Sequence, residues 1–339
     1  MVVAAAPYGT LCGRTIGTPG ELAVTRIVVT GTQGQVSRAL QERATARPDI
    51  DMVALGRPHL DLANPESVAS AIGETAPDLV VNAAAYTAVD SAEDEPELAH
   101  RVNALGAEAV ARAAAHLGVP VIQISTDYVF SGDAGRPYSE QDKPDPHSIY
   151  GRSKLDGEEL VAKANPRHLI LRTAWVYSPF GRNFVKTMLA LAAKQGEVNL
   201  VNDQVGSPTS AFDIADAVLA ISDRLNSEPE FADWGIYHFA GAGQASWAEL
   251  AEATFALSAG LGGPSCTVVS IPSSAYPTKA RRPANSRLDC SRFTRVFGVT
   301  APHWHHSLRL CLQRLSNQWQ VQEDPEQASH SSPKGTKRQ

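Results

Sequence analysis

The sequence predicts an α/β protein with a Rossmann-type, doubly wound parallel sheet and a smaller C-terminal α/β lobe. Three observations predict this class. Short apolar runs alternate with good helix-forming segments, a glycine-rich turn directly follows the first apolar run, and shorter apolar runs with more proline appear after residue 201. Alternating strands and helices form parallel sheets, whose ligands lie at the carboxyl ends of the strands.

The expected elements follow from these runs in order. Strands are expected at 27–30, 51–55, 78–82, 119–125, 168–172 and 198–201. Helices are expected at 34–46, 65–75, 93–117, 148–164, 181–195, 211–226, 246–259 and 303–316. The chain should therefore divide into an NAD(P)-binding Rossmann domain at 25–200 and a substrate-binding lobe at 201–318, with an interleaved boundary.

The two ends of the chain differ from the part between them. Residues 1–24 are rich in Ala, Gly and Thr and lack both helical periodicity and the pattern of a secretion signal, so we expect a flexible extension. Residues 319–339 are polar, and we expect a disordered tail.

Composition excludes several classes of function. With 339 residues and 43% hydrophobic content, the chain can bury a sizeable core. Its net charge of −6 provides no broad basic field, so we expect neither nucleic acid nor a membrane as a partner. The cysteines form no CxxC pair, which favours reduced thiols in a cytoplasmic protein. They are Cys12, Cys266, Cys290 and Cys311.

The glycine-rich turn predicts a dinucleotide site. Gly31-Thr-Gln-Gly34-Gln-Val-Ser37 lies between an expected strand and an expected helix, which is the context such a site requires. Gly31 would make the tight turn, and Gly34 would let the backbone approach a pyrophosphate at the helix N-terminus. Ser37 stands where a third glycine is usual. An ordinary turn between strand and helix is the alternative interpretation.

The end of the second expected strand bears on the choice of dinucleotide. An NAD site usually offers an acid to the ribose 2′-hydroxyl here, whereas an arginine accommodates a 2′-phosphate. The acid is absent and Arg57 is present. We therefore expect NADPH, and NADH stays open because Arg57 can equally be a solvated loop residue.

Tyr150 and Lys154 are candidate catalytic residues. Their spacing puts the phenol and the ammonium on one face of a helix. A nearby cation lowers the pKa of a phenol, which would make Tyr150 a proton donor near neutral pH. The same spacing also occurs on ordinary surface helices. The run at 125–130 supports the functional interpretation, because it ends an apolar strand with polar side chains.

Motifs along the chain, taken together, resemble the dTDP-4-dehydrorhamnose reductases, an extended group of short-chain dehydrogenases/reductases. The resemblance runs from about Arg26 to Leu315. Its motifs are Gly31-Thr-Gln-Gly34-Gln-Val36, Leu60-Asp61-Leu62, Asn82-Ala-Ala-Ala-Tyr-Thr-Ala-Val-Asp90, Ser125-Thr-Asp-Tyr-Val-Phe130, Tyr150-Gly-Arg-Ser-Lys154, Arg172-Thr-Ala-Trp-Val-Tyr177, Asp203-Gln-Val-Gly-Ser-Pro-Thr209 and Arg282-Pro283-Ala-Asn-Ser286-Arg-Leu288-Asp289.

The resemblance implies a reaction and roles for three residues. The reaction is reduction of the C4 keto group of dTDP-4-dehydro-β-L-rhamnose by NAD(P)H, which gives dTDP-β-L-rhamnose. Tyr150 would deliver a proton to the C4 oxygen. Lys154 would lower the pKa of that phenol and hold the nicotinamide ribose, and Thr126 would hydrogen-bond the same oxygen.

The resemblance also implies which residues contact each ligand. The expected cofactor-binding residues are Gly31, Gly34, Gln35, Val36, Arg57, Asp61, Leu62, Ala83, Ala84, Ala85, Tyr150 and Lys154. The expected substrate-binding residues are Val89, Thr126, Asp127, Tyr150 and Trp175. Ordinary structural alternatives exist: Asp61 as a loop acid, the alanines as close packing, and Trp175 as a core indole. Arg282 could pair with a diphosphate or be a surface charge.

Neighbouring functions are separated by a few residues. Sugar-nucleotide dehydratases of the superfamily use Thr-Asp-Glu, and Tyr128 is a poor replacement for that carboxylate base. The missing acid after the second strand argues against epimerases. The alternatives kept open are a non-catalytic regulatory β subunit of methionine adenosyltransferase and a reductase for another 6-deoxy sugar nucleotide. Trp175 with Thr126 and Asp127 favours a reductase, because a scaffold needs no sugar pocket.

A histidine cluster at His303-Trp-His305-His306 raises the question of a metal. No Cys or carboxylate lies nearby at ligand spacing, so we expect surface or cap histidines and no metal in the chain's own site. Some members of the reductase family use Mg²⁺ at a dimer contact, whose ligands the sequence does not identify. A homodimer therefore stays open.

Overall fold

The computed structural model describes residues 24–323. The extension expected at 1–24 and the tail expected at 319–339 lie outside the described residues except at their inner ends. There, helix α11 (Trp304–Glu323) continues past residue 319, so the start of the expected tail is helical.

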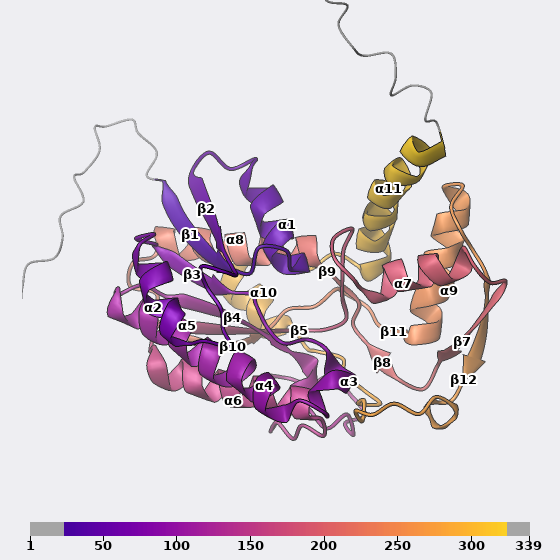
Figure 1. Ribbon diagram of the computed structural model, residues 1–339, viewed down its shortest axis with the longest axis horizontal. Coiled ribbons are helices and arrows are strands. Elements are labelled where there is room, and N and C mark those ends of the chain that lie inside the picture. Colours follow the sequence, from indigo (N-terminus) through magenta and orange to yellow (C-terminus); the bar gives the residue numbers. More distant parts are fainter. Residues whose placement is uncertain (1–23, 324–339) are drawn as a thin grey trace, which may run out of the picture.

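A six-stranded parallel sheet, here called the central sheet, lies between two layers of helices (Figure 1). The strand order is β10-β5-β4-β3-β1-β2, and each neighbouring pair is parallel. The inner strands are buried apolar runs, as is usual in parallel sheets. The predicted Rossmann-type class is confirmed. The strands are β1 (Thr25–Thr30), β2 (Ile50–Leu55), β3 (Leu79–Asn82), β4 (Val121–Thr126), β5 (His168–Thr173) and β10 (Gly235–His238).

Each helix layer buries alternate residues of the central sheet, because successive side chains of a strand point to opposite faces. Val29 and Val81 pack against one layer, and Val80 and Val121 pack against the other. The first layer contains α1 (Gln35–Ala44), α8 (Ala211–Ser227) and α10 (Ser291–Phe297). The second contains α2 (Glu66–Gly73), α5 (Gly106–His116) and α6 (Ile149–Ala164).

The single helix expected at 93–117 is broken into shorter pieces. Pro96 begins a new helix, where its missing N–H costs nothing. Further along, the carbonyl oxygen of Asn103 approaches Gly157 of α6 so closely that a Cβ there would lie 2.1 Å from it. The Asn103 side chain also donates to Ser153 Oγ at 3.0 Å. The pieces are α3 (Val89–Ala92), α4 (Pro96–His100), a π-helical turn η1 (Arg101–Leu105) and α5.

A second part, here called the smaller lobe, is built around a two-stranded parallel pair (Figure 1). Its core is apolar and includes Val185, Leu250 and Leu308. Its elements are β7 (Glu197–Val201), β12 (Thr267–Ile271), α7 (Phe184–Ala192), α9 (Trp247–Gly260), a 3₁₀ turn η3 (Ser273–Ala275) and α11.

One expected strand has a different partner from the one expected, and one strand of the central sheet was not expected at all. The strand expected at 198–201 forms as β7, but it pairs with β12 and does not join the central sheet. The sixth strand of that sheet is β10, and α8 packs on α1, although both come from the range expected for the smaller lobe. The pattern of a segment indicates that a strand forms, whereas its partner depends on tertiary packing.

Short elements complete the described part. The two-residue strands are β6 (Val176–Tyr177) paired with β9 (Thr209–Ser210), and β8 (Val205–Gly206) paired with β11 (Ala245–Ser246). A 3₁₀ turn η2 (Asp127–Val129) follows β4. Cys266, Cys290 and Cys311 are free thiols, and Cys12 lies outside the described residues. Within residues 24–323, no helix combines the length and apolarity needed to cross a membrane.

Candidate active site

The predicted site residues gather where strands of the central sheet end. Gly31 follows β1, Arg57 lies shortly after β2, Ala83 follows β3 and Asp127 follows β4. Parallel strands present their carboxyl ends at one edge of the sheet, where ligands of doubly wound folds bind. The fold therefore brings together residues that are far apart in the sequence.

A row of buried polar side chains crosses three strands at this edge. Thr30 Oγ1 donates to Asn82 Oδ1 at 2.5 Å, and Asn82 Nδ2 donates to Gln123 Oε1 at 2.7 Å. The Thr30 hydroxyl also accepts from the backbone N–H of Ala84 at 3.0 Å. The row fixes the turns after β1 and β3 relative to β4. The apolar strand patterns gave no sign of it.

The glycine turn adopts the conformation that only glycine takes readily. Gly31 has a φ of 86°, and its N–H donates to the Leu55 carbonyl at 2.6 Å. A Cβ at Gly31 would lie 3.4 Å from the Cβ of Ala84, so the turn packs closely on the end of β3. The unusual Ser37 has a function here, because its hydroxyl donates to the Gly31 carbonyl and ties α1 to the turn.

The start of α1 fits the pyrophosphate of a dinucleotide. A Cβ at Gly34 would meet no atom within 4 Å, so there is open space beside the helix N-terminus. No side chain of the described residues caps α1, and its first N–H groups remain available to an anion. The helix dipole adds to their attraction.

Gln35 and Val36 can reach a ligand at this point through their backbones. The Gln35 side chain is already engaged, since its Oε1 accepts from Ser178 Oγ at 2.7 Å and from Asn183 Nδ2 at 2.9 Å. Val36 is buried in the core beside α8. The two side chains therefore hold the turn in place.

The residues expected around the adenosine are in three different environments. Arg57 is exposed at the end of β2. Asp61 Oδ1 accepts from the backbone N–H of Ala63 at 3.0 Å, which is the loop-acid arrangement. Leu62 is buried against Gly106 at the start of α5. Contact of these residues with a cofactor stays a prediction.

The alanines after β3 are partly buried. Ala83 packs on the α1 face of the sheet and Ala84 on the α5 face. Ala85 continues the same segment. Their small side chains let the glycine turn approach the strand end, as the packing alternative predicted, and contact with a cofactor stays a prediction.

Tyr150 and Thr126 meet at the end of β4. Tyr150 lies in the first turn of α6, which Ser148 caps by accepting from the N–H of Gly151 at 3.0 Å. The Thr126 hydroxyl lies near the Tyr150 phenol and acts to lower its pKa. Val89 packs in the same apolar cluster as Tyr150. The two hydroxyls that are expected to be catalytic and one expected substrate-binding residue are thus in one place.

The pKa values differ from the simple expectation for a tyrosine beside a lysine. Burial raises the pKa of Tyr150 to about 12, and the neighbouring Thr126 hydroxyl only partly opposes this. Burial lowers the pKa of Lys154 to about 8, with Glu158 opposing. Lys154 Nζ donates to the Ile124 carbonyl of β4 at 2.7 Å. Desolvation therefore outweighs the expected polarisation of the phenol, and that expectation is wrong for this structure.

Asp127 is a buried carboxyl with spare hydrogen-bonding capacity. Burial raises its pKa to about 7, opposed by the neighbouring hydroxyls of Ser286 and Thr126. Thr126 Oγ1 donates to its Oδ1 at 3.0 Å, whereas Oδ2 has no partner. An unpartnered buried oxygen suits a hydroxyl donor of a ligand.

Trp175 presents a stacked indole that the sequence did not predict. It lies flat on Trp247, with ring centres 3.5 Å apart, and its Nε1 donates to Ser286 Oγ at 3.1 Å. Its φ is 47°, and Gly206 beside it leaves no room for a Cβ. Nothing in the pattern indicated Trp247. Ser286 lies within the family motif at 282–289, but the motif indicated no role for it.

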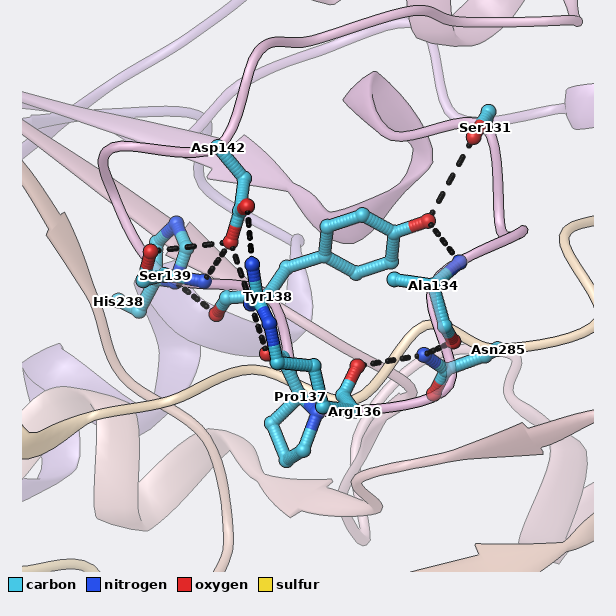
Figure 2. A network of polar contacts seen from close by, with 9 residues as sticks. All are labelled: Ser131, Ala134, Arg136, Pro137, Tyr138, Ser139, Asp142, His238 and Asn285. Carbon is cyan, nitrogen blue, oxygen red and sulfur yellow. Dashed lines mark hydrogen bonds and ion pairs between the residues drawn. The ribbon is translucent and has the colours of Figure 1, made fainter.

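A separate polar network anchors the segment that carries Ser286 (Figure 2). Asn285 Nδ2 donates to the carbonyls of Ala134 at 2.6 Å and Arg136 at 2.8 Å. The Tyr138 hydroxyl accepts from the N–H of Ala134 at 3.1 Å. The loop between β4 and α6 is thereby joined to residues 285–288, so Ser286 is held beside Asp127.

Arg282 pairs with an acid of the protein. Its Nη2 lies 2.7 Å from Oδ2 of Asp90, at the start of α3, and the N–H of Ala280 donates to Oδ1 of the same carboxylate at 3.1 Å. This ion pair connects the segment after β12 to α3. The choice between a diphosphate ligand and a surface charge is therefore still open.

The histidine cluster packs ring against ring. The rings of Trp304 and His305 are 3.6 Å apart, and those of His303 and His305 are 5.2 Å apart. Among the described residues, no three His, Cys, Asp or Glu side chains form a group that could hold a metal ion. The absence of a metal stays a prediction.

A glycine turn that fits a dinucleotide, a buried tyrosine and lysine on one helix face, and a threonine at the end of β4 together define a short-chain dehydrogenase/reductase of the extended type. Residues 25–317 match the family described as the RmlD substrate binding domain. The chain belongs to this family.

Similar proteins are described as dTDP-4-dehydrorhamnose reductases. The chain is 52% identical to the dTDP-4-dehydrorhamnose reductase of Sinorhizobium fredii over 284 residues, which cover 84% of this chain and 95% of that protein. It is 42% identical to the same enzyme of Escherichia coli, covering 85% of this chain and 97% of that protein. A dTDP-4-dehydrorhamnose reductase from Bacillus anthracis, solved in complex with NADP, superimposes with a TM-score of 0.78 at 33% identity, covering 86% and 99%.

Proposed function

We propose that the chain is an NAD(P)H-dependent oxidoreductase that reduces the C4 keto group of dTDP-4-dehydro-β-L-rhamnose to give dTDP-β-L-rhamnose for polysaccharide biosynthesis. The observation that carries this proposal is the buried Tyr150 phenol, which lies beside the Thr126 hydroxyl where β4 ends. Family membership supports the substrate, because the relatives described above are dTDP-4-dehydrorhamnose reductases.

NADPH is the proposed cofactor, with NADH as the alternative. When bound, the reduced nicotinamide supplies a hydride to the C4 carbon. The N–H groups at the start of α1 would hold the pyrophosphate, and the exposed Arg57 is available to a 2′-phosphate. The NADP complex of the B. anthracis relative supports this assignment.

The proton comes from Tyr150. Because the pKa of Tyr150 is raised to about 12, the phenol is protonated at neutral pH, as a proton donor must be. Thr126 orients the hydroxyl and hydrogen-bonds the C4 oxygen. Lys154, with a pKa of about 8, is mostly charged at pH 7 and would hold the ribose of the cofactor.

The sugar would lie between the two parts of the molecule. Asp127 Oδ2 is available to accept from a sugar hydroxyl. Trp175, supported by Trp247, offers an indole surface to the deoxysugar, and Val89 lines the same side as Tyr150. The smaller lobe is therefore proposed as the substrate-binding lobe. A cytoplasmic location and a homodimer are further proposals, the second to be tested by sedimentation.

NADPH oxidation tests the proposed function. The substrate is dTDP-glucose pre-treated with the dehydratase and the 3,5-epimerase. Tyr150→Phe keeps the ring and removes the proton, so the turnover rate should fall roughly 10²–10⁴-fold. The matched control is Tyr237→Phe, a buried tyrosine of β10 whose hydroxyl bonds to the Asp233 carbonyl, and it should keep the wild-type rate.

The outcome also separates the alternatives. A wild-type rate for Tyr150→Phe would contradict the assignment of the proton donor. Binding of NADPH without any turnover by the wild-type protein, together with tight binding to a methionine adenosyltransferase, would instead support the regulatory β subunit. Turnover of only a different 4-keto sugar nucleotide would support a related reductase.

A further inference from the structure

Glu158 lies one helical turn beyond Lys154 and two turns beyond Tyr150, so all three side chains share one face of α6. The roles proposed above do not use it. Its side chain is only 3% exposed, and a buried carboxylate is costly unless other groups satisfy it. Such a group beside two reaction residues requires an explanation.

Two side chains of the central sheet hold the Glu158 carboxylate. Arg172 of β5 binds it with Nη2 at 2.6 Å from Oε2 and Nε at 2.9 Å from Oε1. Ser125 of β4 donates to Oε1 at 2.5 Å. Ser125 and Arg172 are register partners, and Ser125 directly precedes Thr126. The carboxylate therefore ties α6 to the two strands at the level of the catalytic hydroxyls.

The same arrangement places a negative charge beside the Lys154 ammonium. Lys154 donates to the carbonyl of Ile124, the residue before Ser125, so its amine lies next to the strand segment that Glu158 binds. The pKa of Lys154 is lowered by burial, and Glu158 is the charge that opposes this.

Other ionisable groups around this point face elsewhere. Asp127 of η2 acts on Tyr150, and His238 of β10 lies near Arg172. His100 of α4 pairs with Asp156 of α6, and Arg112 pairs with Glu108 within α5. Each of these pairs has at least one well-exposed member. Asp90 of α3 is bound to Arg282.

We propose that Glu158 is a positioning residue for the reduction: its carboxylate, fixed by Arg172 and Ser125, keeps the Lys154 ammonium charged and in place. This inference rests on the role proposed for Lys154. It extends the Tyr150 and Lys154 pair by one further turn of α6, to an acid that acts through the lysine.

A direct titration of Lys154 tests the proposal on the full chain. Protein labelled with ¹³C at lysine Cε is titrated by NMR, and the Lys154 signal is assigned by its loss in Lys154→Arg. The wild-type midpoint is expected near 8. Glu158→Gln removes the charge and leaves Arg172 unbalanced, so the midpoint should fall by about one pH unit or more. Glu158→Asp keeps the charge and should keep the midpoint, although the shorter acid weakens the Arg172 contact.

The pH dependence of kcat/KM is measured on the same variants. Its alkaline limb should move together with the Lys154 titration midpoint in Glu158→Gln and should stay in place in Glu158→Asp. An unchanged Lys154 midpoint in Glu158→Gln would overturn the proposal. A midpoint that moves while the limb stays would contradict the role of Lys154 in the reaction, and with it the positioning role of Glu158, although Glu158 would still act on the lysine.

Folding does not limit the test. If Glu158→Gln alone does not fold, Glu158→Gln combined with Arg172→Gln removes both charges and should still lower the midpoint, because the carboxylate is the charge that acts on Lys154. An unmoved midpoint in that double variant overturns the proposal.

Discussion

The central sheet and the smaller lobe contribute to the site in different ways. The sheet and its helix α6 carry the groups proposed for the chemistry, namely Tyr150, Thr126 and Lys154. Outside that framework, Trp247 of α9 and Ser286, in the segment after β12, support the Trp175 indole, which is the proposed sugar surface. The first set is fixed by strand register and helix period, and the second by contacts between distant segments. Changes in the first set should therefore affect rate or pH dependence, and changes in the second should affect substrate affinity.

Asp127 gives the largest expected effect on stability. Its pKa is raised to about 7 in the folded protein by burial, against about 4 in an unfolded chain. The ionised carboxylate therefore costs stability above pH 7, and this cost disappears as the pH falls towards 4. Asp127→Asn should raise the free energy of unfolding by on the order of 2–4 kcal/mol at pH 8 and leave it unchanged at pH 4, as measured by denaturant unfolding.

An acid with the opposite shift serves as the control. Arg136 holds the pKa of Asp142 below its usual range, so the Asp142 carboxylate contributes stability above pH 4 that is lost as the pH falls. Asp142→Asn should therefore lower stability at pH 8. If Asp127→Asn also lowered the free energy of unfolding at pH 8, the ionised Asp127 carboxylate would not be destabilising and this explanation would be wrong.

Trp247 tests the contribution of the smaller lobe. Without it, the Trp175 indole loses the ring on which it is stacked. Trp247→Ala should raise KM for the sugar nucleotide roughly tenfold, since an aromatic pair contributes about 0.5–1.5 kcal/mol beyond buried area. The value of kcat should stay near wild type. Trp234→Ala, which removes an indole packed on Phe231 instead, is the matched control and should leave KM unchanged.

If Trp247→Ala lowered only kcat, the proposed difference between the two regions would be wrong, because a residue of the smaller lobe would then affect the rate and not substrate affinity. That result would show that the stacked indoles position the reacting groups and not only the sugar.

Ser286 has the smallest expected effect. Ser286→Ala removes the acceptor of the Trp175 indole N–H, and one such hydrogen bond is worth about 1 kcal/mol. KM should rise roughly fivefold with kcat retained. The control is Ser258→Ala, which removes a buried hydroxyl of α9 that donates to the Pro264 carbonyl. It should leave both KM and kcat unchanged. Equal kinetics for the two variants would show that Ser286 does not hold the indole.

The sequence predicted features that depend on neighbouring residues. The turn at Gly31 and Gly34 could be predicted because its conformation and its flanking strand and helix are encoded locally. The shared face of Tyr150 and Lys154 followed from the helix period alone. The family motifs then placed Thr126 beside them, as the structure has it.

Features that depend on distant segments were not predictable in this way. The partner of β7 is β12, and no local pattern connects them. The stack of Trp175 on Trp247 likewise joins two segments whose meeting only the fold determines. The pKa of Tyr150 was expected to be lowered by a neighbouring cation, but burial and the contact of Lys154 with the Ile124 carbonyl could be known only from the structure.

The central claim is that one phenol gives its proton to the reduced carbonyl, and a single-turnover measurement tests it most directly. Enzyme with bound NADPH is mixed with the keto sugar nucleotide, and the loss of NADPH is followed for the wild type and for Tyr150→Phe. The account predicts a first-order rate at least about 100-fold slower in the variant, with the NADPH dissociation constant unchanged. Equal rates for the two proteins would contradict it.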